Sequence, residues 1–122
     1  MTKAAAIHAF WNSFSLPAYE ENSVPEDAAF PYITYQLVTD AYIREVPMTA
    51  SVWYRSTSWK ECNAKAEEIG RAIGMGGKAL TCDSGAIFIR RGTPFSQSMG
   101  DESDDLVKRK YINISADFIT AE

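Results

Sequence analysis

The sequence predicts an α+β fold in a single domain spanning residues 1–122, with a mostly antiparallel sheet and two helices on one face of it. The chain of 122 residues has the length of one ordinary domain. Two segments carry apolar residues at helical spacing, and several others alternate polar with apolar residues as strands do. The expected order is α-β-β-α-β-β. Helices this few, beside an antiparallel-rich sheet, normally cover one of its faces.

The first expected helix covers residues 3–14. Thr2 can cap its start. Large apolar side chains recur at helical spacing and form one face: Ile7, Phe10, Trp11 and Phe14. Pro17 ends the helix. The following stretch, 17–30, holds two prolines and four acidic residues and is interpreted as a surface connection.

Two strands are expected next. The stretch "FPYITYQLVT" is rich in β-branched and aromatic residues, and Ile33 and Tyr35 share one face of it. A turn follows within "DAYIRE". Residues 46–55 then alternate as a second, long strand, antiparallel to the first, with Pro47 at its start or on an edge of the sheet.

The second helix opens at Ser58, which forms a capping-box pattern with Glu61. Its apolar stripe predicts one buried face: Trp59, Cys62, Ala66, Ile69 and Ile73. The stretch "GMGG" at 74–77 ends the helix, because glycine tolerates the positive φ angles found at helix ends.

The last third of the chain is expected to form strands around one flexible loop. "KALTC" and "AIFIRRG" make either one interrupted strand or two short ones. Residues 94–105 are polar and are expected to form the flexible loop. From Val107 to Ile119 the chain alternates again, so Lys108 and Lys110 should project to one side of this strand and Arg109 to the other.

Composition narrows the classes of function. The formal charge of −4 argues against a nucleic-acid binder that relies on neutralising phosphates. The sequence contains no run of about 18 apolar residues, so no membrane-spanning helix is expected. The N-terminal stretch is interpreted as a domain helix rather than a signal peptide. Cys62 and Cys82 match no metal spacing and are expected to be free thiols in a reducing cytoplasm.

The acidic cluster near the C-terminus is the first candidate for chemistry. Its "DESDDLVKRKYI" lacks the central glycine and the distal glutamate of a calcium loop, so a solvated loop is the favoured interpretation. His8 is the single histidine and lies off the apolar stripe of its helix. We therefore expect no catalytic residues, no cofactor and no metal, and a protein that is not an enzyme.

Interface residues are the better expectation. Trp53 should face outward, and tryptophan is enriched at the centres of protein interfaces, although packing beneath a helix is an equal alternative for Trp53 and Trp59. The residues expected at a subunit or partner interface are Trp53, Arg55, Arg90, Arg91, Asp101, Glu102, Asp104 and Asp105.

Nearly the whole chain resembles one family. "FPYITYQLV", "VPMTASVWYRSTSWKECNAKAEEIGRAIG" and "GAIFIRRGTPFSQSMGDESDDLVKRKYINISADFI" are similar to the tail-terminator (tail-completion, or minor tail) proteins of long-tailed bacteriophages and prophages. The best-matched positions are Pro31, Tyr32, Tyr35, Trp53 and Arg91. The 94–105 loop varies in that family.

The resemblance implies a structural virion protein of the phage tail, assembled in the bacterial cytoplasm. Such proteins form a ring, typically a hexamer, on the tail tube. The ring stops tube polymerisation and provides the head–tail joining surface. The implied partners are other copies of the chain, the tail tube protein and the head–tail connector protein. DNA is only a passing cargo, no membrane is involved, and the free protein can be a monomer.

Three alternatives remain open. The first is a head-closure or connector-adaptor protein of the same virion. The second is a cellular module that binds a small ligand in an apolar pocket with a few polar groups. An enzyme that uses the acidic cluster is the third.

Overall fold

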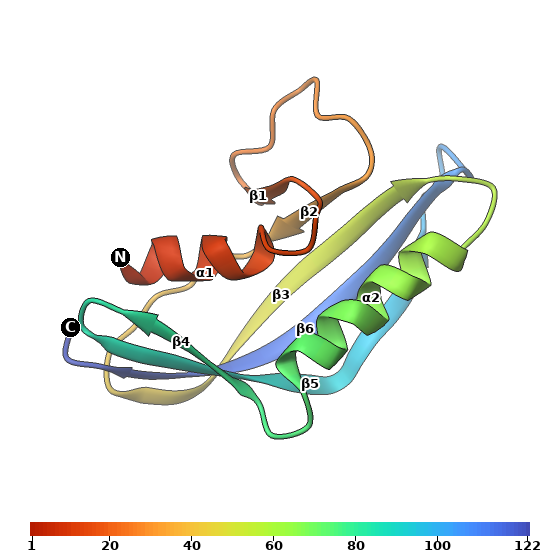
Figure 1. The fold of residues 1–122 in the computed structure, drawn as a ribbon. Helices are drawn as coiled ribbons and strands as arrows, with labels where there is room; N and C mark the ends of the chain where they lie inside the picture. Colours follow the sequence, from red (N-terminus) through yellow and green to blue (C-terminus); the bar gives the residue numbers. More distant parts are fainter.

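A computed structural model describes all residues, 1–122, as one domain of two helices and a six-stranded, curled sheet (Figure 1). Its elements are, in order, α1 (Lys3–Trp11), β1 (Ala18–Glu20), β2 (Tyr32–Tyr35), β3 (Ile43–Arg55), α2 (Lys60–Ile73), β4 (Lys78–Cys82), β5 (Gly85–Gly100) and β6 (Val107–Thr120). The two predicted helices are therefore present, although α1 ends at Trp11 and not at the predicted residue 14, and the fold is mainly sheet.

The sheet is mixed, and the strand order is β1-β2-β3-β6-β5-β4. Four of its pairings are antiparallel, but β1 pairs with β2 in parallel. The predicted order α-β-β-α-β-β therefore lacks two strands. It omits β1, whose three residues are too few to show alternation, and it counts once the segment that the sequence leaves open as one interrupted strand or two strands, which the structure forms as β4 and β5.

One core lies between the sheet and both helices. Alternate residues of the paired central strands point into it, such as Ala50 opposite Ile112 and Met48 opposite Ile114. On the α1 side, the Trp11 ring stacks against Tyr35 of β2. Each large apolar side chain that is fully buried contributes about 1.5–3 kcal/mol relative to an exposed one. Because α1 and α2 share this cluster, they cover the same face of the sheet.

Helix α2 buries the predicted apolar stripe, and its start differs in detail from the predicted capping box. The Lys60 N–H donates to Ser58 Oγ at 3.1 Å, while Trp59 occupies the cap position and provides no side-chain cap. The helix ends at Gly74, where φ is +75° and the N–H donates back to the Gly70 carbonyl. The "GMGG" stretch therefore ends the helix as predicted.

The long β5–β6 hairpin corrects the prediction of a loop over 94–105. Strand β5 continues to Gly100, and the ladder to β6 resumes at Ser96 after a register shift that begins at Arg91. Pro94 lies in this irregularity, where a residue without an N–H is tolerated. The Asn113 side-chain amide donates to the Pro94 carbonyl at 3.0 Å. Only residues 101–106, named here the acidic tip, connect the strands.

The two cysteines are unbonded and lie in different surroundings. Cys62 is fully buried on the inner face of α2, with its Sγ 3.6 Å from the Val52 carbonyl oxygen, and burial raises the pKa of its thiol to about 11. Cys82 is partly exposed at the end of β4.

These surroundings predict unequal thiol reactivity. At pH 8, Cys62 should react with a disulfide reagent about 100-fold more slowly than Cys82, because so little of it is thiolate. The rate at which the reagent releases its coloured thiol, measured for the Cys82→Ser and Cys62→Ser variants, assigns each kinetic phase to one cysteine. In denaturant both thiols should react at similar rates. Equal rates in the native protein would contradict the burial of Cys62.

Candidate functional site

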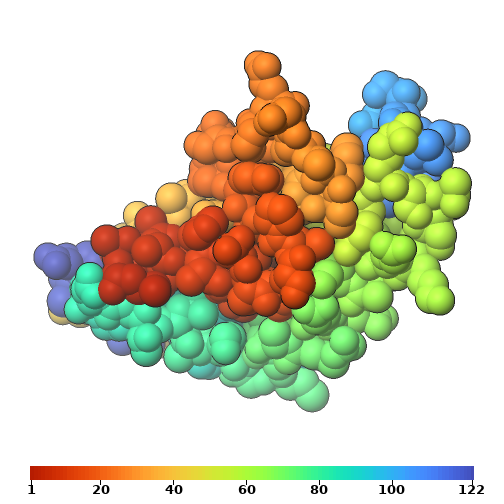
Figure 2. Space-filling view, turned by 45° about the horizontal axis from the view of Figure 1, so that its top comes forward, coloured from red at the N-terminus to blue at the C-terminus, as the bar shows by residue number.

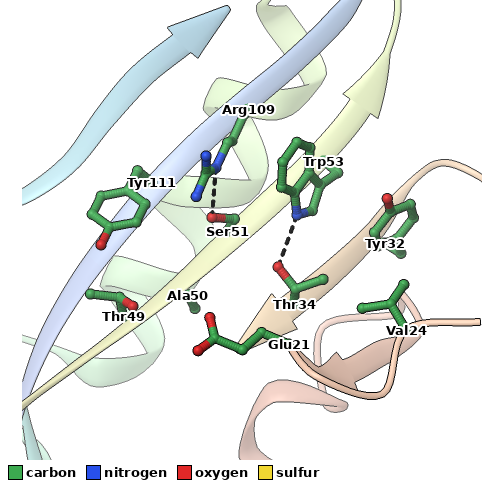
Figure 3. A pocket seen from close by; sticks show the side chains of 10 residues that line it. All are labelled: Glu21, Val24, Tyr32, Thr34, Thr49, Ala50, Ser51, Trp53, Arg109 and Tyr111. Carbon is green, nitrogen blue, oxygen red and sulfur yellow. Dashed lines mark hydrogen bonds between the residues drawn. The ribbon is translucent and has the colours of Figure 1, made fainter. Parts of the chain in front are cut away.

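The face of the sheet opposite the helices carries the most distinctive group of side chains. On β2, β3 and β6 every second residue points to this open face, because strand side chains alternate. Trp53 pairs with Tyr32 on one side and Arg109 on the other, so the three side chains lie in a row across the strands. Figure 3 shows these side chains around one cavity.

The row forms a continuous stack of rings and one cation. The Tyr32 and Trp53 rings stack with centroids 6.3 Å apart and planes 25° apart. The Arg109 guanidinium carbon lies 4.7 Å from the centroid of Trp53 and 5.1 Å from that of Tyr111. Arginine on an aromatic face is stabilised by the ring quadrupole, more strongly where water is partly excluded. This stack positions the Arg109 guanidinium.

Two hydrogen bonds fix the orientation of the stack (Figure 3). Arg109 Nε donates to Ser51 Oγ at 2.9 Å, and Trp53 Nε1 donates to Thr34 Oγ1 at 2.9 Å. Arg109 forms no ion pair with any carboxylate of the chain. Its terminal nitrogens are therefore free to bind an anion.

The stack borders a cavity of about 330 Å³, named here the Arg109 cavity. Thr34, Thr49 and Ser51 supply hydroxyl groups to its wall, and Glu21 and Val24 border it from the connection that follows β1. In Figure 3, Glu21 lies across the cavity from Arg109. The cavity thus offers one cation, one carboxylate, aromatic surface and hydroxyl groups, which suits a polar guest with an anionic group.

A second polar centre on the open face surrounds Asp117, which is buried. Its carboxylate accepts from Arg90 Nη2 at 2.7 Å and from the Glu45 backbone N–H at 2.8 Å, and Arg44 Nε lies 3.9 Å away. These contacts, with Arg90 contributing most, hold the pKa of Asp117 below its usual value. The Glu45 N–H is available because β3 bulges between Ile43 and Val46.

The structure brings together only some of the predicted interface residues. Trp53 lies in the stack on the open face, which is one of the two positions that the sequence leaves open. Arg55 pairs with Asp104 through Nε and Oδ2 at 3.1 Å, which joins the end of β3 to the acidic tip. Arg90 belongs instead to the Asp117 centre. Arg91 is exposed beside α2, where it borders a hollow with Gly70 and Phe95.

The four acidic side chains of the tip have different surroundings. Asp101 accepts from the N–H and hydroxyl of Ser103, and Asp104 accepts from the Leu106 N–H, so hydrogen bonds lower the pKa of both carboxyls. Glu102 and Asp105 are exposed. Nowhere in the chain do three His, Cys, Asp or Glu side chains come together as a metal would require.

The predicted separation of the basic triplet is confirmed. Lys108 lies over the Trp59 ring at 5.6 Å on the helix side, while Arg109 joins the open-face stack. Arg109, Ser51 and Asp117 nevertheless were not among the site residues predicted from the sequence. Alternation placed Arg109 on its face, but no local signal showed that β3 and β6 pair with Trp53 opposite Arg109.

Comparison with known proteins adds no assignment. No protein-family model matches the chain, and no curated protein matches its sequence. No helix is long and apolar enough to cross a membrane.

The Asp117 centre predicts a pH-dependent loss of stability. Asp117→Asn should lower the free energy of unfolding at pH 7 by about 2 kcal/mol, because the buried side chain loses its charge-assisted hydrogen bond and ion pair with Arg90. The carboxylate contributes stability above the unfolded pKa of about 3.9, and this contribution is lost as pH falls through the lower folded pKa.

Urea unfolding of wild type and variant at pH 7 and pH 3 measures this effect. The difference in stability should shrink at pH 3. Asp27→Asn, which changes an exposed aspartate, is the matched control and should have little effect at either pH. A difference that stays constant between the two pH values would show that the ionised Asp117 carboxylate is not the cause.

Proposed function

We propose that the protein is a structural component of a phage virion that terminates the tail tube as a ring of identical subunits. The proposal begins from the sequence resemblance to tail terminators. The observation that carries it further is that one subunit exposes two unlike surfaces. One is the open face with the aromatic and arginine stack, and the other is the projecting β5–β6 hairpin with its acidic tip.

A ring requires head-to-tail contacts between different patches of neighbouring subunits. Beyond Ile89, strand β5 pairs with β6 but has no strand on its outer edge, because β4 pairs only with residues 85–89. The opposite edge of the sheet is the short β1. Figure 2 shows the acidic tip standing out from the body of the molecule, beside the segment that precedes α2. An outer edge and a projecting tip support assembly through unlike surfaces.

Under this proposal the ring is a hexamer that sits on the tail tube protein and presents its other side to the head–tail connector protein. DNA passes through the ring without being recognised. This role requires binding surfaces and no bond-making chemistry. Its place is the tail of the virion, assembled in the cytoplasm of a bacterial host.

The direct test is polymerisation of the tail tube protein with and without this chain. We expect shorter tubes with a ring of extra density at one end, because a bound ring blocks further addition. Electron microscopy of tube lengths measures the effect. A head-closure role instead predicts co-sedimentation with DNA-filled heads and unchanged tube lengths, and that result would overturn the proposal.

A variant separates specific capping from nonspecific binding. Neutralising the acidic tip with Asp101→Asn, Glu102→Gln and Asp105→Asn should leave the fold intact, since these side chains are exposed, and should weaken capping. Met75→Ser, in the exposed turn after α2, is the control and should cap like the wild type. Equal capping by both variants would exclude the tip from assembly.

A further inference from the structure

We propose that the Arg109 cavity binds a carboxylate from the acidic tip of a second copy of the chain, with Glu102 as the entering side chain. The inference rests on the proposed function only in assuming that copies of the chain assemble. It names a contact that neither the resemblance nor the comparisons assign.

The Arg109 guanidinium is already positioned to bind an anion in the cavity. Arg109 is partly buried, its guanidinium lies between the rings of Trp53 and Tyr111, and its Nε is already bonded to Ser51. The two terminal nitrogens remain without a carboxylate partner. A planar guanidinium with both terminal nitrogens free matches the two oxygens of a carboxylate. Because stacking already restricts the side chain, little conformational entropy is lost on binding.

The tip of the same subunit is badly placed to supply this carboxylate. Arg109 reaches toward Ser51, which pairs with Tyr111, and so its side chain leans along the sheet away from the hairpin end. The tip starts only after Gly100, which pairs with Lys108. A tip that fills this cavity must therefore come from another copy of the chain.

Glu21 limits how much negative charge a ligand can bring into the Arg109 cavity. It lies across the cavity from Arg109 in Figure 3, and it is exposed and forms no ion pair. A small dianion would meet repulsion from this carboxylate. A single carboxylate side chain such as Glu102 instead places only one negative charge in the cavity. The opposed charges of Arg109 and Glu21 thus favour the entry of one carboxylate side chain over a free multivalent anion.

The tip supplies a suitable anion. Asp101 and Asp104 are engaged by Ser103, Leu106 and Arg55. Glu102 is exposed and forms no ion pair, and it lies on the acidic tip, which stands out from the body of the molecule in Figure 2. Arg109 is thus a cation in a cavity without an ion-pair partner, and Glu102, like Asp105, is an exposed tip carboxylate without one. Joining Arg109 to Glu102 links unlike surfaces, which is the contact that a head-to-tail assembly repeats.

A labelled peptide of residues 98–107, SMGDESDDLV, tests the contact with the intact protein. Fluorescence anisotropy should show saturable binding to the wild type and at least tenfold weaker binding to Arg109→Gln. Arg71→Gln removes the same charge from the exposed side of α2 and should bind like the wild type. In the peptide, Glu102→Gln should weaken binding at least fivefold, whereas Asp104→Asn should have a smaller effect.

Charge exchange provides a second readout that does not depend on loss of binding. Arg109→Glu should reject the native peptide and bind a peptide carrying Glu102→Lys more tightly than the wild-type protein does. Circular dichroism verifies that each variant is folded. If Arg109→Glu is unfolded, the peptide substitutions on wild-type protein decide the question alone, because they leave the folded protein unchanged.

Several results would overturn the inference: no saturable peptide binding, equal binding by Arg109→Gln and Arg71→Gln, or binding of benzoate at the cavity without binding of the peptide. Its failure is distinguishable from failure of the proposed function. Peptide binding with unchanged tail tubes would retain the self-contact and reject termination. Shortened tubes without peptide binding would retain termination and reject this contact.

Discussion

The pairing of β3 with β6 is the constraint on which the rest of the structure depends. It runs from Ile43 opposite Phe118 to Arg55 opposite Val107, through the middle of the sheet. Because strand side chains alternate, this one register places Met48, Ala50, Ile112 and Ile114 under the helices and sends the intervening residues to the open face. A slip of one residue would expose the core and bury Arg109. The hydrophobic pattern of the two strands therefore selects their register, and this register places Arg109 beside Trp53 in the stack.

Irregularities in the long strands give this sheet its particular polar features. The bulge in β3 frees the Glu45 N–H, which donates to Asp117, and Arg90 reaches the same carboxylate from β5. The irregularity in β5 lies around Pro94 and lets the ladder with β6 resume toward the tip. Both depart from regular pairing at positions where a side chain supplies the missing hydrogen bond. They let long strands bend around the core while the hairpin still projects from it.

The arrangement of charge explains how an acidic chain can still present a specific cation. Arg55 and Arg90 are neutralised by Asp104 and Asp117, whereas Arg109 is held by rings and a hydroxyl group. A carboxylate neighbour forms an ion pair with an arginine and occupies its hydrogen-bond donors. Aromatic neighbours instead position the guanidinium and leave its donors free. The open face is therefore distinguished by geometry rather than by net charge. A surface of this kind suits selective contact with one partner better than general attraction to anions.

The sequence by itself determined the α+β class, both helices, the alternation of the long strands and the opposite directions of Lys108 and Arg109, because periodicity follows from local backbone geometry. It did not reveal β1, whose three residues form a strand only beside β2, or the continuation of β5 beyond Pro94. Only the tertiary structure decided that Arg109 meets Trp53 and Ser51, and that Asp117 meets Arg90. Those contacts join residues far apart in the chain, and their register depends on the packing of the whole core rather than on any local pattern.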